Sequence, residues 1–417
     1  MSQNYCTFVP EMVQTTMMRK LFLIQTALLI VCVPSMQAGK TPSKALVFFY
    51  RVGEWMDNFQ LKDLDTNYIA LPEHSWHVAL TAGGVGIHST YTTWVDPETA
   101  VTLRAQTTPS LDIGFSADYR GLGGGYSWDV LNAYTTKWNI SLGGSALGME
   151  IARNVSTNLK GKFYMGKEWM ANTPVLDKGE FRISTTSLSA WYILNATHYS
   201  HNAAFDHCTI QKRTAGSLLL SLAYMSSQME ILDTAKYIHD ENAVTLIDGV
   251  TGTITRQVAL GLGYGINYTP NRGKVLLHAS ANMQLVCYSV NHISYALPST
   301  GSLQGEPQFV MRPATPVHVT GNIRAAVSWE ISPWVYLSAW GQAYHLRFKS
   351  KSGDMSALAI GNWNWQAHIN IGVRFGAGQK RVREVLGEPK RPVTSPKPEK
   401  KSRMPQWLTD YFFAPAH

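Results

Sequence analysis

His278 and Ser280 stand two residues apart in the stretch VLLHASANMQL, in which apolar and polar side chains alternate. In a β-strand, residues two apart point to the same face, so the imidazole and the hydroxyl are expected to lie side by side. A histidine base beside a serine nucleophile, with a third polar group that orients the imidazole, is the arrangement that acyl-transfer chemistry uses. Asn267, in the preceding alternating segment, and Asn282 are the candidates for that third group.

The face on which this pair stands favours an ordinary polar lining over catalysis. Outer-membrane phospholipase A and the lipid A deacylase carry a His-x-Ser pair on the lipid-facing side of a barrel strand. Here Val275, Leu277 and Leu285 lie on the apolar face of the predicted strand, and this face is expected to contact lipid. His278 and Ser280 are then expected to face inward. We favour a non-enzymatic protein and keep a lipid-modifying hydrolase as the alternative.

A metal site is not supported by the sequence. Residues 63–67 read DLDTN, like the opening of a calcium-binding loop, but Tyr68 and His74 stand where such a loop needs glycine and glutamate. The 13 histidines include no H-E-x-x-H motif. We therefore expect no metal ion and no cofactor, and we interpret residues 63–67 as a turn or a helix cap.

Gly261, Gly263 and Gly265 are spaced by two, whereas a dinucleotide-binding turn needs the spacing G-x-G-x-x-G. The intervening positions carry large apolar side chains, which predicts a strand. The glycine face would either let another segment approach closely or allow strong coiling of the strand, and coiling is the preferred interpretation. Similar alternation recurs along the chain, at 76–81, 101–106, 111–119, 138–142, 275–285, 317–328 and 362–375.

Composition and segment length favour a membrane barrel. Only 15% of the residues are charged, against ~25% in an average domain. The alternating segments match the ~9–11 residues that a strand needs to cross a bilayer. We predict an all-β protein: a closed antiparallel transmembrane β-barrel of about 12 strands, between about 10 and 14. The lumen-facing parity is predicted to carry Arg104, Asp112, Asp118, His278, Asn282, Arg324, Asn370 and Arg374.

The two ends of the chain differ from the barrel. Basic residues at 19–20, an apolar run at 21–33 and a polar breaker before Ala38 are typical of a secretory signal peptide, with Met17 or Met18 as the true start. The predicted organisation is a signal peptide at 1–38, an N-terminal segment at 39–70 with an amphipathic helix at 43–59, the barrel at 71–375 and a basic, proline-containing tail at 376–417.

The charge of the chain suggests its partners. From Lys380 to the end there are nine Lys and Arg residues against four Asp and Glu residues, which is most of the net charge of +8. In an exported protein such a tail fits an anionic lipid surface or an acidic envelope partner better than nucleic acid. The expected partners are the lipid bilayer of the outer membrane and a periplasmic or envelope partner for the tail, with no nucleic acid.

The region from 192 to 217 resembles a family of exported β-barrel-like proteins common in Bacteroidetes and known as a domain of unknown function. Residues 65–69, 261–267 and 278–280 are similar to that family too, and the resemblance covers roughly 62–375. It implies the barrel fold and the outer-membrane location, and it implies no reaction. The residues that carry the central motif are Tyr192, Asn195, Tyr199, Ser200, Ala203, Ala204, Phe205, Gln211, Arg213, Gly216 and Ser217.

The leading hypothesis is a non-enzymatic outer-membrane β-barrel, either a narrow pore or a structural or envelope-assembly component. One alternative is the lipid-modifying hydrolase that uses His278 and Ser280. Another is a soluble periplasmic β-protein that binds an envelope partner. The sequence leaves open whether the lumen is open or plugged and whether Cys208 pairs with Cys287.

Overall fold

The computed structural model describes most of the chain between residues 44 and 376. The predicted signal peptide at 1–38 and nearly all of the predicted tail at 376–417 lie outside the described residues. The described ranges are 44–61, 64–94, 100–108, 110–131, 135–169, 175–232, 250–270, 273–295, 308–315, 317–350 and 358–376.

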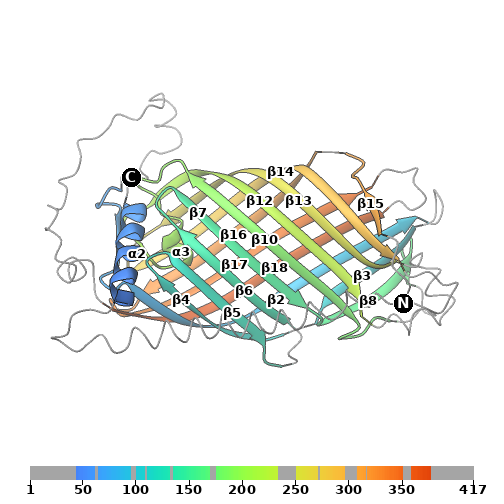
Figure 1. The fold of residues 1–417 in the computed structure, drawn as a ribbon, viewed down its shortest axis with the longest axis horizontal. Coiled ribbons are helices and arrows are strands. Elements are labelled where there is room, and N and C mark those ends of the chain that lie inside the picture. The colour runs from blue at the N-terminus through green and yellow to red at the C-terminus, as the bar shows by residue number, and fades with distance from the viewer. Residues whose placement is uncertain are drawn as a thin grey trace.

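Within these ranges, twelve strands form one closed antiparallel barrel (Figure 1). The last strand pairs with the first over its whole length, from Phe375 opposite Trp76 to Leu358 opposite Thr93. The predicted fold class is therefore confirmed. The strands are β2 (Trp76–Trp94), β4 (Asp112–Tyr119), β5 (Leu122–Asp129), β6 (Thr135–Gly143), β7 (Leu147–Ser156), β10 (Phe181–Ile193), β12 (Ala215–Ile231), β13 (Val250–Tyr268), β14 (Val275–Tyr295), β16 (His318–Glu330), β17 (Val335–Lys349) and β18 (Leu358–Phe375).

The two halves of the barrel are built differently. We call the end that holds Trp76 and Phe375 the proximal end and the opposite end the distal end. The four strands from β4 to β7 are short. They form the barrel wall only near the proximal end, where β4 pairs with the first residues of β2. In the distal half, β3 (Ala100–Thr107) pairs with the end of β2, and β8 (Leu159–Met165) pairs with β3. Two short strands, β9 (Glu168–Trp169) and β15 (Gln308–Met311), extend this half.

The direction of the apolar side chains reverses between the two halves. In the proximal half they point outward, as Leu260, Leu262 and Ile369 do, and the inward side chains are polar. In the distal half of most strands apolar side chains point inward and pack together, which leaves polar side chains outside, whereas β13 buries Thr253 and Thr255 there and β14 exposes Tyr288. We call this buried group the distal apolar cluster: Val85, Ile87, Tyr91, Val101, Leu103, Ala105, Leu159, Phe163, Leu176, Phe181, Ile183, Met229, Ile231, Ile293, Leu346, Phe348, Leu358 and Ile360.

This reversal makes the prediction for Arg104 wrong. Its neighbours Leu103 and Ala105 belong to the distal apolar cluster, so Arg104 stands on the outer face and is exposed. Alternation identifies the two faces of a strand, but it does not say which face is buried.

An α-helix, α2 (Lys44–Leu61), lies across the proximal end (Figure 1), close to the predicted 43–59. Met56 is fully buried, and Gly53 leaves room for the Tyr119 ring at the rim. The opposite side of the helix exposes Phe48 and Trp55. Among the described residues, no helix combines the length and the apolar character needed to cross a membrane.

Candidate functional site

The connection between β10 and β12 folds back against the proximal end of the barrel wall. We call residues 194–214 the plug. It contains the short helix α3 (Asn202–Phe205) and the strand β11 (Ile210–Gln211), which pairs with β1 (Ile69–Ala70). Tyr199 and Ala204 are fully buried, as befits a segment packed inside a wall of strands. Most of the family-like motif lies in the plug, whereas Tyr192 precedes it and is half exposed on the outer face.

The buried amide of Gln211 ties the two ends of the plug together. Its Oε1 accepts from the Ser200 backbone N–H at 2.9 Å and from Asn267 Nδ2 at 3.1 Å. Its Nε2 donates to the carbonyls of His198, at 2.6 Å, and Arg213, at 3.0 Å. A buried amide with all these bonds made stabilises one geometry, because each bond that is lost leaves a desolvated group unpaired.

The sequence-predicted residues His278, Ser280 and Asn267 meet beside the plug in a linear chain of hydrogen bonds. His278 Nδ1 is 2.8 Å from Asn267 Oδ1, and His278 Nε2 is 3.1 Å from Ser280 Oγ. Asn267 Nδ2 donates to the Ser200 carbonyl at 2.7 Å, which leaves its Oδ1 to accept from the imidazole. His278 then carries its proton on Nδ1, and its Nε2 accepts from the serine hydroxyl. The other candidate, Asn282, instead donates to Ser221.

The plug covers this chain of bonds. The ring of His278 lies 5.3 Å from that of His201 and 5.0 Å from that of Phe205. Tyr199 reaches the strand wall at Gly265, where a Cβ would stand 2.3 Å from the tyrosine hydroxyl. Of the two interpretations of the glycine face, close approach of another segment therefore applies at Gly265.

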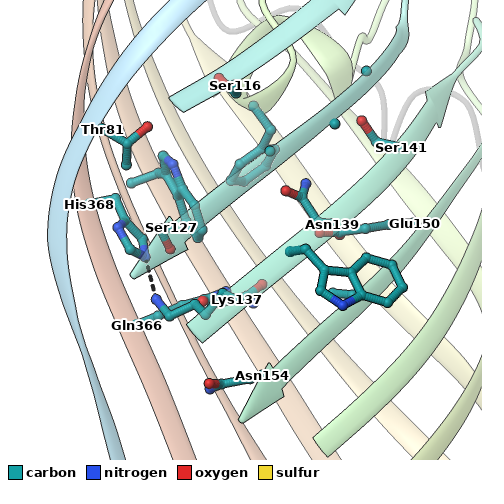
Figure 2. Close-up of a pocket in the computed structure, with 18 of the residues that line it drawn as sticks. Thr81, Ser116, Ser127, Lys137, Asn139, Ser141, Glu150, Asn154, Gln366 and His368 are labelled. Carbon is teal, nitrogen blue, oxygen red and sulfur yellow. Dashed lines mark hydrogen bonds between the residues drawn. The ribbon is translucent and has the colours of Figure 1, made fainter. Parts of the chain in front are cut away.

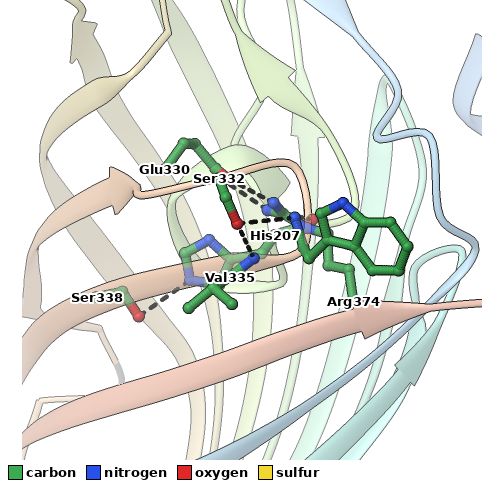
Figure 3. Close-up of polar contacts among 7 residues, drawn as sticks. His207, Glu330, Ser332, Val335, Ser338 and Arg374 are labelled. Carbon is green, nitrogen blue, oxygen red and sulfur yellow. Dashed lines mark hydrogen bonds and ion pairs between the residues drawn. The ribbon is translucent and has the colours of Figure 1, made fainter.

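A second anchor holds the far end of the plug (Figure 3). His207 Nε2 is 3.1 Å from Ser338 Oγ, and the His207 carbonyl accepts from Arg374 Nη2 at 3.5 Å. Arg374 also donates hydrogen bonds from both Nη atoms to the carboxylate of Glu330. Its Cζ lies 4.8 Å from the centre of the Tyr336 ring. The guanidinium is almost completely buried, so the bidentate carboxylate is what makes its burial tolerable.

Side chains from nearly opposite walls meet across the lumen at two further levels. Arg324 of β16 lies 3.4 Å from Glu150 of β7. Asn362 of β18 donates to Ser227 of β12 at 3.1 Å. In each pair the strands stand five positions apart in the ring of twelve. Beyond the second pair lies the distal apolar cluster, so the plug, two polar bridges and an apolar layer follow one another along the lumen.

A polar cavity of about 200 Å³ extends along the lumen from Asp206 of the plug, past Arg324 and Glu150, to Val85 of the distal apolar cluster (Figure 2). Gly123 and Gly125 belong to its lining and leave room for neighbouring side chains, because a Cβ there would stand 2.3 Å from Asp118 Oδ2 or 2.8 Å from Asn139 Oδ1. Among the described residues, no group of three or more His, Cys, Asp and Glu side chains is arranged to hold a metal ion. The lining of the cavity includes Thr81, Ser116, Ser127, Lys137, Asn139, Ser141, Glu150, Asn154, Gln366 and His368.

Lys137 joins three strands at the edge of this cavity. Its Nζ lies 3.2 Å from Asp112 Oδ2 and 3.0 Å from His368 Nε2 (Figure 2). In the sequence Lys137 alternates with apolar residues in the same way as Asn139 and Ser141. The pattern of its strand therefore predicts that Lys137 faces the lumen. Glu150 was missed because the sequence around it has no clear alternation.

The other residues predicted to face the lumen have side chains on the inner face of the barrel. Their side chains are buried or partly buried inside the wall, and Arg104 is the exception described above. They are Asp112, Asp118, His278, Asn282, Arg324, Asn370 and Arg374. Cys208 is buried in the plug, Cys287 is exposed on β14, and the two form no disulfide.

Burial shifts the acid–base behaviour of the plug. It lowers the pKa of His201 well below its ordinary value, and His278 and Arg324 add to this effect. Burial lowers the pKa of His207 in the same way. The carboxyl of Asp206 has a pKa well above its ordinary value, first because of burial and then because acidic groups lie nearby. At neutral pH His201 and His207 are therefore uncharged.

Comparisons with known proteins match this architecture to a family without an assigned activity. No curated protein sequence matches the chain. Among solved structures, the outer membrane protease OmpT from Escherichia coli is similar at a TM-score of 0.36 and 8% identity, over 73% of this chain and 98% of that one. The outer membrane protein OprG from Pseudomonas aeruginosa is similar at 0.25 and 11%, over 74% and 100%. TM-scores this low say nothing of what this chain does.

The family model described as "Domain of unknown function (DUF4421)" matches residues 63–375. These residues contain all twelve barrel strands of the described chain, the plug and both of its anchors. The chain therefore belongs to the DUF4421 family.

Proposed function

We propose that this protein is a non-enzymatic outer-membrane β-barrel whose lumen is closed, and that it serves as a structural or envelope-assembly component and not as a pore. The observation that carries this proposal is the filling of the lumen by its own side chains. The plug is anchored at Asn267 and at Arg374, and the Arg324–Glu150 bridge crosses the space behind it. A conducting barrel of this size needs a continuous aqueous path.

The outer surface of the proximal half supports a membrane location. On β18 the outward residues Val373, Ile371 and Ile369 are each about half exposed, and Trp365 and Trp363 follow at the distal edge. An outward apolar band bordered by aromatic residues is what a bilayer requires of a barrel. Export through a signal peptide at 1–38 and an envelope partner for the basic tail at 376–417 belong to the same proposal.

Cell fractionation followed by gel mobility of boiled and unboiled protein tests the location. We expect the protein in the outer-membrane fraction, with faster migration of the unboiled sample because the closed barrel stays folded. Recovery in the soluble periplasmic fraction without a shift would contradict the membrane proposal. The outward apolar band would then have to be covered by a protein partner.

A second candidate function is hydrolysis of an acyl ester of an envelope lipid. The ordered bonds from Asn267 to His278 to Ser280 favour it, because they give the serine a base of the right tautomer. Against it, the same bonds anchor the plug, and Ser280 does not line the polar cavity.

Fatty-acid release from phospholipid vesicles that contain the refolded protein separates the two functions. If the protein is a hydrolase, Ser280→Ala abolishes release, and Ser221→Ala, which removes another inward serine, preserves it. We expect no release from the wild-type protein. Release that depends on Ser280 would overturn the non-enzymatic proposal.

A further inference from the structure

Basic side chains gather on the outer face of the distal half. Lys349 lies two residues beyond Arg347 on β17, and Lys160 lies two residues before Lys162 on β8. We call Arg104, Lys160, Lys162, Arg347 and Lys349 the basic patch. The central row of register partners crosses five strands and comprises Arg347 of β17, Gly361 of β18, Thr90 of β2, Arg104 of β3 and Lys162 of β8.

The reversed facing of the distal half puts these side chains in solvent. All five are exposed, whereas Leu103, Phe163 and Phe348 between them are buried in the distal apolar cluster. Each position of the patch is therefore fixed by the packing of its strand neighbours, and the charges stand on a rigid wall and not on a loop.

Aromatic rings support three of the five cations. The Arg104 guanidinium lies 4.2 Å from the centre of the Tyr164 ring. Lys162 lies 4.7 Å from the Trp169 ring, and Lys349 lies 5.7 Å from the Trp94 ring. Contacts of this kind hold each charged group over a ring face at the exposed surface and restrict where it can move.

The patch contains little opposing charge. Lys160 has an ion pair with Asp177 at 3.3 Å, and both side chains are at least half exposed, so the pair is weak. Among the described residues, the central row and the outward-facing rows two positions above and below it contain no acidic side chain.

A flat strip separates the cations into two groups. Gly361, Thr90 and Thr92 stand between Arg347 on one side and Arg104 on the other. Three strand spacings separate the two arginines, which is about 14 Å at ~4.8 Å per spacing. The strip offers small side chains and hydroxyl groups, which suit contact with a sugar ring.

The patch lies directly beyond the outward apolar band. Trp363 lies two register positions from the central row, on its proximal side, and Trp365 follows two positions further on. If the band lies in a membrane, as the proposed function holds, these tryptophans mark the interface and the basic patch lies at the height of the headgroups.

From this geometry we infer that the basic patch binds the headgroup of a glycolipid that carries a phosphate at each end of a sugar backbone. One phosphate binds the Arg104 group, the other binds the Arg347 group, and the sugar lies on the strip between them. Rigid guanidinium groups bind phosphate in a bidentate manner. This inference rests on the proposed outer-membrane location and adds a lipid partner to it.

The test measures binding of diphosphoryl lipid A and of its fully dephosphorylated form to full-length protein in neutral detergent, by native mass spectrometry. We expect the phosphorylated lipid to bind preferentially. Arg104→Gln/Arg347→Gln is expected to weaken that binding roughly 30-fold, since each basic residue near an anionic surface contributes ~1 kcal/mol. The control, Arg182→Gln/Arg256→Gln, removes two basic charges from β10 and β13 and is expected to bind as the wild type does.

Gel mobility of unboiled protein, measured on the same samples, separates failure of the inference from failure of the proposed function. A folded barrel that binds both lipids equally, or that loses binding equally in the two variants, overturns the inference alone. A protein without the heat-dependent shift overturns the barrel in the membrane, and the lipid inference with it.

Discussion

Arg324 and Glu150 approach to 3.4 Å across the lumen, although their strands stand on nearly opposite walls and 174 residues separate them in the sequence. Arg324 also lies 5.7 Å from the ring of Phe205 in the plug. One arginine therefore links β16, β7 and the plug.

Removal of one partner of this bridge is expected to destabilise the barrel. In Arg324→Gln the Glu150 carboxylate stays in a partly buried site without its cation, and such a loss costs roughly 1–3 kcal/mol, less than for a fully buried pair. Urea unfolding of the refolded protein in detergent measures the change. The double variant Arg324→Gln/Glu150→Gln should recover part of the lost stability. A loss in the double variant equal to the sum of the losses in Arg324→Gln and Glu150→Gln would show that the bridge itself contributes nothing.

Gly265→Val is expected to displace the plug, because the new side chain would occupy the place of the fully buried Tyr199 hydroxyl. Limited proteolysis of the native protein should then cleave within residues 194–214 at a much higher rate than in the wild type. Gly321→Ala is the matched control, since a Cβ at Gly321 meets only a backbone oxygen at 3.7 Å. Equal cleavage rates in the two variants would contradict the placement of Tyr199.

Acid is expected to weaken the folded barrel through the histidines of the plug. Burial holds the pKa of His201 and His207 below the ordinary 6.5, so the unfolded chain binds protons below that pH and the folded protein does not. The free energy of unfolding then falls by about 1 kcal/mol per pH unit for each histidine as the pH drops below 6.5. His207→Gln should reduce this dependence, as measured by urea unfolding between pH 7.5 and pH 5.

Asp206 acts in the opposite direction. Its pKa is raised in the folded protein, so the folded state holds a proton that the unfolded chain releases above the ordinary pKa of 3.8. Acidification therefore stabilises the folded state through this one group. Asp206→Asn should make the acid-induced loss of stability steeper than in the wild type. A shallower loss would mean that Asp206 is ionised inside the barrel.

The barrel could be predicted from the sequence because its strands alternate over more residues than ordinary strands do. The clearest case, 362–375, became β18, and His278, Ser280 and Asn267 came together as their parity and strand order require. Arg104 could not be placed in the same way. Its strand lies in the distal half, where the apolar side is the buried side, and the alternation of a single strand is the same in either case.

The contacts behind the proposed closure of the lumen were beyond prediction. Residues 194–214 attracted attention through the family-like motif, but their inward path depends on contacts with Asn267, Gly265 and Arg374, which come from other strands. The Arg324–Glu150 bridge requires the complete strand order of the ring, which no local pattern contains.

Single-channel recording tests the central claim most directly. Wild-type protein with a verified heat-dependent gel shift is inserted into a planar lipid bilayer, and the current is followed under an applied voltage. A closed lumen predicts no stable conductance steps. Reproducible unit steps from the wild-type protein would show a continuous aqueous path and would contradict the closure by the plug, the polar bridges and the distal apolar cluster.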